Sequence, residues 1–78
     1  MKLPRELDGE ELAKLLEKFG YRLVRQTGSH MRLAREGDRI TIPRHKLKVG
    51  TLNSILNEVA RQLGMDKKEL VKELFKKR

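Results

Sequence analysis

The sequence of 78 residues lacks cysteine and tryptophan, and it contains only one tyrosine and two phenylalanines. A chain without cysteine forms no disulfide framework and no thiolate metal site, which fits a reducing compartment. No apolar run exceeds three residues, so no segment is long enough to span a membrane as a helix. The opening residues 1–4 lack the apolar stretch of a signal peptide. We therefore expect a cytoplasmic protein without membrane contact, with a single domain over residues 1–78.

Positive charge is what the sequence has in excess, with 19 Lys and Arg against 11 Asp and Glu and a formal net charge of +8. Most of that excess lies in residues 21–48, which hold eight basic and two acidic residues and so carry +6. Residues 1–20 carry −1 and residues 49–78 carry +3. A positive field concentrated on one segment is typical of a protein that binds a polyanion. A solvated basic surface without a ligand is the alternative.

Residues 8–20 predict the first helix. Asp8 suits the N-cap position, and Glu11, three residues later, completes a capping box with it. Gly20 fits the position just past the helix end, where a left-handed residue is common. The apolar residues of this stretch recur at helical spacing and give the helix one buried face. They are Leu12, Leu15, Leu16 and Phe19.

Three short segments in the middle of the chain predict strands, because they are rich in residues that favour β-structure. These segments are residues 21–26, 29–35 and 39–43. Gly37, at the centre of residues 36–38, favours a tight turn between the last two strands. Short strands joined by tight turns predict a three-stranded antiparallel sheet. In the first strand the pattern leaves open whether Leu23 or Val24 faces the core.

The second and third strands alternate between apolar and polar residues, which assigns each side chain to one face of the sheet. The apolar face takes Met31, Leu33, Ile40 and Ile42. The other face takes His30, Arg32, Ala34, Arg39 and Thr41. The apolar face needs a cover of helices, whereas the opposite face is expected to be open, wet and basic.

A second helix is predicted after the basic stretch 44–50, because apolar residues recur at helical spacing from Leu52 to Leu63. Thr51 suits its N-cap, and Gly64 suits the position just past its end.

A short last helix is predicted at about residues 66–76, with Asp66 as its N-cap and Glu69 completing a capping box. Whether this helix packs on the core, joins two copies of the chain or contacts a partner protein is left open by the pattern. The complete order is α-β-β-β-α plus this extra C-terminal helix. It predicts an α+β fold whose three-stranded antiparallel sheet is covered by helices on one face.

His30 stands out because it is expected at the start of a strand, on the open face, two residues from Arg32. The preceding Gly28 permits an unusual backbone conformation and lets a ligand approach the main chain closely. Histidine is the side chain that ordinarily changes charge between pH 5 and 8, which suits a general acid or base. An exposed histidine on a strand is more often a plain surface residue, so the spacing alone does not establish catalysis.

Three stretches of the sequence together resemble the HicA family of toxin–antitoxin ribonucleases. They read GEELAKLLEKFGYRLVRQTGSHMRLAR, ITIPRHK and KVGTLNSIL, and they cover roughly residues 9–57. The Gly-Ser-His motif of residues 28–30 between these flanks carries most of the resemblance. The resemblance implies a fold similar to the double-stranded-RNA-binding domain, with a HicA-like core at about residues 8–63. The last helix is an addition, since members of this family usually end soon after the second helix.

The resemblance also implies a function, that of the toxin in a type II toxin–antitoxin system. Such a toxin is a metal-independent endoribonuclease that cleaves mRNA without a cofactor and is neutralised by a HicB-like antitoxin. The histidine of the motif is essential in that family, and its role as catalytic base falls on His30 here. We expect RNA to lie on the open face and to contact eight further residues. They are Arg25, Gly28, Ser29, Arg32, Arg44, His45, Lys46 and Lys48.

Several alternatives stay open beside this hypothesis. His45 is either the general acid or, as we favour, a structural or RNA-contacting residue. The whole chain could also be a non-catalytic RNA-binding module of the same fold. A metal site is disfavoured, because the two histidines lie fifteen residues apart with no acidic residue at ligand spacing. A DNA-binding regulator is disfavoured because the positive charge lies on the strands and neither long helix has a basic face.

Overall fold

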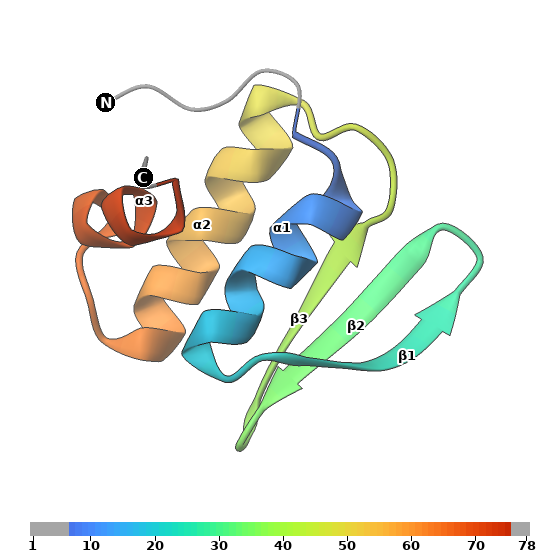
Figure 1. Cartoon of the computed structure of the whole chain (residues 1–78), viewed down its shortest axis with the longest axis horizontal. Helices are drawn as coiled ribbons and strands as arrows, with labels where there is room; N and C mark the ends of the chain where they lie inside the picture. Colours follow the sequence, from blue (N-terminus) through green and yellow to red (C-terminus); the bar gives the residue numbers. More distant parts are fainter. Residues whose placement is uncertain (1–6, 76–78) are drawn as a thin grey trace.

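A computed structural model describes residues 7–75, and it shows a three-stranded antiparallel sheet in the order β1-β2-β3 with helices on one side (Figure 1). The elements in chain order are α1 (Gly9–Leu16), η1 (Glu17–Phe19), β1 (Arg22–Thr27), β2 (His30–Arg35), β3 (Asp38–Pro43), α2 (Val49–Leu63) and α3 (Lys67–Leu74). The predicted α-β-β-β-α order with an extra C-terminal helix, an α+β fold, is therefore confirmed.

The start and the end of the first helix follow the predicted signals. The Asp8 carboxylate accepts a hydrogen bond from the Glu11 backbone N–H (2.9 Å), and the Glu11 side chain accepts one from the Asp8 N–H (3.3 Å). The α-helix proper ends at Leu16, and one 3-10 turn carries the chain on to Gly20. Gly20 has a φ of +96°, the left-handed conformation expected of a terminating glycine.

The core lies between the sheet and the three α-helices, as the strand pattern predicted. Met31 and Leu33 of β2 and Ile40 and Ile42 of β3 are all buried, while His30, Arg32, Arg39 and Thr41 are exposed on the opposite face. The helices add Leu12, Leu16, Leu52, Leu56, Val59 and Leu70 to one continuous hydrophobic cluster.

The first strand lies outside this cover. Tyr21 is fully buried but precedes β1, and every residue of β1 is exposed. Of the two candidates for the core, Leu23 points to the helix side, opposite the buried Leu33, but it is 51% exposed and not buried, and Val24 is 58% exposed. The physical reason is that β1 is an edge strand and a groove between it and α1 leaves Leu23 uncovered. The pairing with β2 also shifts by one residue between Leu23 and Arg25, a β-bulge that interrupts the alternation at Val24.

A chain of hydrogen bonds through the buried Tyr21 joins the start of the sheet to α2. The Tyr21 hydroxyl donates to the Gln62 side-chain oxygen (2.6 Å), and the Gln62 amide nitrogen donates to the Arg39 carbonyl oxygen (2.8 Å). Burial, with the nearby Asp38 carboxylate as the next cause, raises the pKa of the Tyr21 phenol. The phenol therefore stays protonated and able to donate over the whole neutral range of pH.

The N-cap of helix α2 (Val49–Leu63) lies three residues earlier than predicted. Lys48, and not Thr51, occupies the N-cap position, and the Leu52 N–H donates to the Lys48 carbonyl (2.8 Å). The Leu47 side chain, just before this N-cap, is buried in the core, and this burial fixes the position at which the helix begins. Gly64 ends the helix with a φ of +68°, as predicted.

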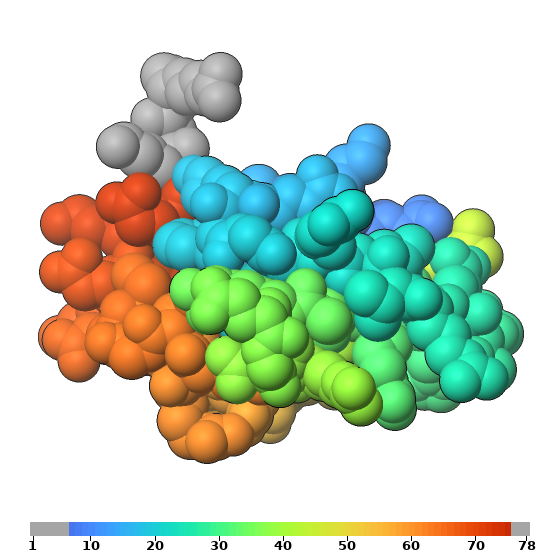
Figure 2. All heavy atoms as spheres, turned by 90° about the horizontal axis from the view of Figure 1, so that it is seen from below, coloured from blue at the N-terminus to red at the C-terminus, as the bar shows by residue number. Residues whose placement is uncertain are grey.

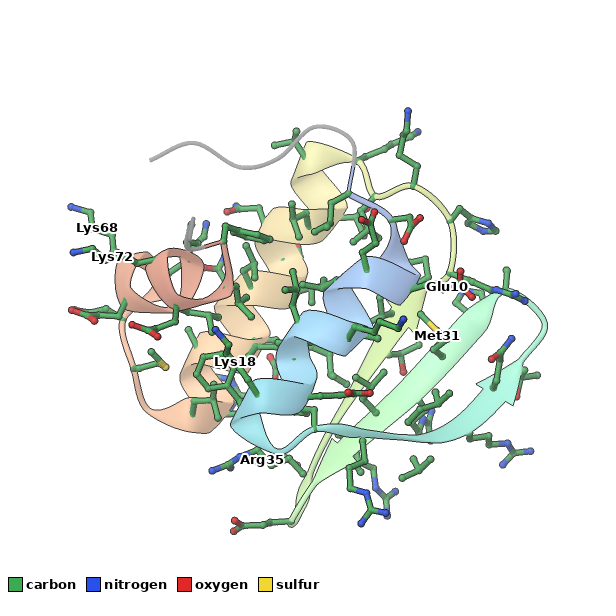
Figure 3. All side chains as sticks on the ribbon, in the orientation of Figure 1. Glu10, Lys18, Met31, Arg35, Lys68 and Lys72 are labelled. Carbon is green, nitrogen blue, oxygen red and sulfur yellow. The ribbon has the colours of Figure 1, made fainter. Side chains whose placement is uncertain are left out.

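The extra helix α3 packs on the core, which settles one of the alternatives for it. Leu70, Val71 and Leu74 are buried, and the Lys18 ammonium donates to the Glu73 carbonyl (2.8 Å). Its lysines 68 and 72 project outward (Figure 3). Asp66 takes the predicted N-cap position, but no side-chain hydrogen bond caps the helix, so the expected capping box with Glu69 is absent. The predicted end at residue 76 lies outside the described residues.

In the turn between β2 and β3, the left-handed backbone conformation is adopted by Glu36 and not by the glycine beside it. Arg35 pairs with Asp38, so the turn contains only Glu36 and Gly37. Glu36 has a φ of +53°, whereas Gly37 does not have a positive φ. A two-residue hairpin turn of this type requires a positive φ at its first central position, which here is filled by glutamate.

Gly9 joins the start of α1 to the end of β3. Its N–H donates to the His45 carbonyl (2.9 Å), and a Cβ built on it would lie 1.7 Å from the Pro43 carbonyl oxygen. Pro43 in turn pairs with His30 across the ladder. The absence of a side chain at position 9 thus allows the close packing that holds the sheet end carrying His30.

Replacing Gly9 with alanine should lower the free energy of unfolding by at least about 2 kcal/mol, because the backbone oxygen of Pro43 cannot move without distorting the strand end. Gly50→Ala is the matched control, since a Cβ there meets nothing within 4 Å, and it should be neutral or stabilising by up to about 1 kcal/mol. Urea unfolding monitored by circular dichroism measures both variants. Equal stabilities for the two variants would contradict the tight packing at Gly9.

Candidate active site

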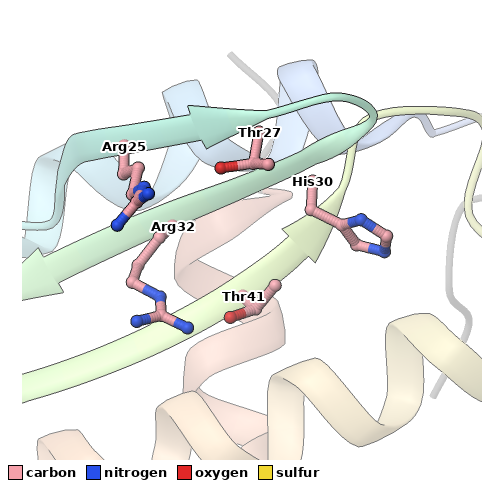
Figure 4. A pocket seen from close by; sticks show the side chains of 5 residues that line it. All are labelled: Arg25, Thr27, His30, Arg32 and Thr41. Carbon is pink, nitrogen blue, oxygen red and sulfur yellow. The ribbon is translucent and has the colours of Figure 1, made fainter.

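A shallow pocket of about 320 Å³ opens on the uncovered face of the sheet. Figure 4 shows the side chains of the five residues that line it on this face. They are Arg25 and Thr27 from β1, His30 and Arg32 from β2, and Thr41 from β3. The pocket therefore draws on all three strands. The prediction that His30 and Arg32 share an open, basic face is confirmed.

The ladder register brings these side chains together. Thr27 lies directly opposite His30, Arg25 lies opposite Arg32, and Arg32 lies opposite Thr41. Directly opposed residues of an antiparallel pair have their Cβ atoms roughly 5 Å apart. His30 is exposed to solvent at the start of β2, and no hydrogen bond or ion pair of its ring is present within residues 7–75. The imidazole is thus available to a bound ligand.

Arg25 and Arg32 form an opposed pair of like charges, which destabilises a sheet rather than stabilising it. No carboxylate lines the pocket, and within the described residues neither guanidinium has an ion-pair partner. A phosphate placed between the two arginines would satisfy both with charge-assisted hydrogen bonds. The pocket is therefore suited to an anion with several oxygens.

The turn before His30 has the unusual backbone conformation that Gly28 was expected to permit. Gly28 has a φ of +56°, and a Cβ on it would meet no atom within 4 Å, so space is open beside the turn. The Ser29 carbonyl accepts a hydrogen bond from the Arg44 N–H (2.6 Å). This bond ties the hairpin turn to the loop that follows β3. Neither Gly28 nor Ser29 lines the pocket itself.

The basic loop after β3 is held away from the pocket and against the start of α1. The Arg44 side chain donates to the Glu10 carboxylate (3.0 Å), and the segments around Asp8 and Lys46 form a short antiparallel bridge. His45, Lys46 and Lys48 are exposed, but none of them lines the pocket. Of the nine predicted site residues, the structure brings Arg25, His30 and Arg32 into one pocket and leaves the other six outside its lining.

Thr27 and Thr41 are pocket residues that the sequence reasoning did not assign to the site. Strand parity had placed Thr41 on the open face, but a threonine on a strand carries no functional signal by itself. Thr27 lies one residue beyond the predicted end of the first strand. Once Arg32 and His30 were chosen, the cross-strand register would have identified both threonines.

One protein family, described as the HicA toxin of bacterial toxin–antitoxin systems, has a sequence profile that matches residues 9–65. The chain belongs to the HicA toxin family. It is thus the toxin of a toxin–antitoxin pair, and an antitoxin is its counterpart. No curated protein and no solved structure matches the chain.

The family match covers α1, the sheet and α2, and it includes every residue that lines the pocket of this toxin. It ends just before α3, so the extra helix is outside the part shared with the family. Within residues 7–75, no helix is long and apolar enough to cross a membrane, and no group of three or more His, Cys, Asp or Glu residues is placed to hold a metal ion.

The opposed arginines give a direct stability test. Replacing Arg32 with glutamine should raise the free energy of unfolding by about 0.2–1 kcal/mol at low salt, because it removes a like-charge pair. The gain should shrink in about 1 M salt, where exposed charges are screened. Arg39→Gln is the control, since Arg39 is on the same face but lies opposite Ala34. A loss of stability in Arg32→Gln larger than in the control would show that the two guanidiniums do not oppose one another.

Proposed function

We propose that this toxin is a metal-independent endoribonuclease that cleaves mRNA in the cytoplasm, with His30 as its general base. The observation that carries the proposal is the position of an exposed imidazole in one pocket with two guanidiniums that have no carboxylate partner among residues 7–75. An exposed histidine alone is ordinary. Two opposed arginines beside it cost stability, and such a cost is expected where a site is shaped for a ligand.

The RNA binds as a single strand across the open face. One phosphate lies between Arg25 and Arg32, where both guanidiniums donate hydrogen bonds to its non-bridging oxygens. The flanking phosphates reach the exposed loop, where they contact His45, Lys46 and Lys48. Arg44 contributes from a greater distance, because its side chain is held by Glu10.

The chemical step uses the ribose itself as the nucleophile. His30 removes the proton from a 2′-hydroxyl, and the 2′-oxygen attacks the adjacent phosphorus. The bond from phosphorus to the 5′-oxygen of the next nucleotide breaks, which leaves a 2′,3′-cyclic phosphate and a 5′-hydroxyl. The departing oxygen takes a proton from water, because His45 lies outside the pocket. DNA lacks the 2′-hydroxyl and is not cleaved.

The transition state is stabilised by the positive wall of the pocket. Charge develops on the non-bridging oxygens during the attack, and the guanidiniums of Arg25 and Arg32 are already in place to meet it. The Thr27 and Thr41 hydroxyls stand beside them and donate to the phosphate or to the sugar. Because the arginines supply the positive charge and none of the described residues lining the pocket is a carboxylate, the proposed reaction proceeds without a divalent metal ion.

The antitoxin of this toxin is a HicB-like protein that covers the His30 pocket. The toxin–antitoxin assignment of the family supports the existence of the partner. The exposure of the pocket supports the mode of inhibition, since no element of the described chain shields His30 and a second protein must do so.

A non-catalytic RNA-binding module is the second candidate function. The observation that favours it is that the described residues lining the pocket include one histidine and no carboxylate, so His30 has no second acid–base side chain beside it. Under this alternative the same face binds RNA in a salt-sensitive manner and leaves it intact.

The decisive experiment compares His30→Ala with His45→Ala on a labelled single-stranded RNA in the presence of EDTA. We expect the wild type to cleave the RNA and to produce cyclic phosphate ends. His30→Ala should lower the rate about 10²–10⁴-fold, the usual effect of losing a general base, while His45→Ala should lower it only slightly. Circular dichroism confirms that both variants remain folded.

Two outcomes separate the candidates. Cleavage by His30→Ala at the wild-type rate would remove His30 from the chemistry. Tight, salt-dependent RNA binding by the wild type without any cleavage would overturn the nuclease proposal in favour of the binding module.

A further inference from the structure

The outer edge of β1 has no neighbouring strand within the described chain. β1 pairs only with β2, all six of its residues are exposed, and no other backbone hydrogen bond of residues 7–75 involves them. Figure 2 shows the side chains of β1 (teal) uncovered on this side of the molecule, next to those of α1 (blue). An edge of this kind exposes N–H and C=O groups to which another strand can pair.

A groove on the helix side of the sheet adjoins this edge, between β1 and α1. Its floor contains Leu23, Gln26 and Met31. The opposite wall is formed by α1 with the residues that flank it, and it carries four carboxylates and one lysine, from Asp8, Glu10, Glu11, Glu17 and Lys14. Glu10 and Met31 lie toward the same end of the sheet (Figure 3). Although Arg44 pairs with Glu10, the groove keeps a negative excess on a chain whose net charge is +8.

The other side of the same edge is positive. Arg22 and Arg25 point to the open face, because they pair with Ala34 and Arg32 of β2. Leu23 points to the helix side, because it pairs with the buried Leu33. The edge therefore separates a basic surface on one side from an apolar and acidic surface on the other.

We propose that the β1 edge docks an extended segment of a partner protein in which carboxylates alternate with apolar or basic side chains. Alternate residues of an added strand point to opposite faces of the sheet. Carboxylates on one face then meet Arg22 and Arg25, while apolar and basic side chains on the other face meet Leu23 and the acidic groove. Main-chain hydrogen bonds supply the affinity. The basic surface on one side of the edge and the acidic groove on the other set the register of the docked segment.

A second copy of the toxin fits this edge poorly. Pairing of β1 with its own symmetry mate would place Arg22 and Arg25 of both copies on the same open face, where like charges repel. The bulge between Leu23 and Arg25 also interrupts the edge, and bulges of this kind discourage pairing between identical edges. The docked segment therefore makes its main-chain hydrogen bonds along the stretch from Arg25 to Thr27 and continues past the bulge toward Arg22. Its side chains cover the exposed Leu23 and Val24.

Gln26 is the residue that tests the backbone pairing. The two-residue turn makes Thr27 and His30 the hydrogen-bonded pair that closes the hairpin, so Gln26, in the next pair, directs its N–H and C=O away from β2. Proline at this position removes the outward N–H and leaves the ladder to β2 intact. The Gln26 side chain lies outside the His30 pocket, so the variant leaves the proposed cleavage machinery unchanged.

Docking at this edge also reaches the proposed RNA site. A carboxylate beside Arg25 would neutralise one of the two guanidiniums that hold the phosphate, so the docked segment and RNA compete. This competition rests on the proposed nuclease function, whereas the docking itself does not.

The test is an NMR titration of the full ¹⁵N-labelled chain with an acetylated probe peptide of sequence Glu-Leu-Glu-Lys-Glu-Leu-Glu-Lys. We expect chemical-shift changes in the amides of β1 and of the facing side of α1. Gln26→Pro should weaken binding about tenfold, through a lost hydrogen bond and a steric clash, while Gln26→Ala should bind like the wild type. RNA cleavage by Gln26→Pro, assayed in parallel, should stay at the wild-type level.

The control peptide has the same composition with its residues grouped, as Glu-Glu-Glu-Glu-Leu-Leu-Lys-Lys. The proposal is overturned if this peptide binds equally well, because plain charge attraction would then explain the binding. It is also overturned if β1 does not respond, if both Gln26 variants bind alike, or if sedimentation shows the free toxin to be a dimer through this edge. Each of these results can occur in a toxin that still cleaves RNA, so a failure here is distinct from a failure of the nuclease proposal.

Discussion

Burial of one face of the sheet beneath the helices is the constraint on which the rest of this toxin depends. Met31 and Leu33 of β2 contribute to the core, and alternation along the strand then forces His30 and Arg32 to the opposite face. A slip of one residue would bury charged side chains and expose the apolar ones, which no small domain can sustain. The hydrophobic core thus holds the polar pocket in its register without touching it.

The pocket contains a pair of like charges that lowers the stability of the sheet. Arg25 and Arg32 face one another although nothing in the core requires two cations at that position. The close contact between Gly9 and Pro43 fastens the same end of the sheet to α1, so that the strand end opposite His30 is held while its face stays open. A tight attachment on one side and unsatisfied charge on the other are what a preorganised anion site requires.

Most of the fold could be predicted from the sequence, because its helices and the strands β2 and β3 carry complete local periods. The strand at β1 was predicted, but the facing of its side chains could not be, since a strand exposed on both faces has no alternation to read and a bulge beside Val24 breaks what pattern there is. The start of α2 depended on the burial of Leu47, a tertiary contact that the capping signal at Thr51 does not contain. Strand parity placed His30 on the open face and a family resemblance suggested its catalytic role, whereas Thr27 and Thr41 needed the strand register.

The central claim is that a phosphate of RNA binds between Arg25 and Arg32, beside His30. An NMR titration of the ¹⁵N-labelled toxin, with an RNA that carries a single 2′-deoxyribose at the cleaved step, tests this most directly because the ligand is not consumed. The account predicts that the guanidinium Nε–H signals of Arg25 and Arg32 and the backbone amides of β2 shift together, with an affinity that falls steeply as salt is added. Shifts confined to α2 or α3, with both guanidinium signals unchanged, would contradict it.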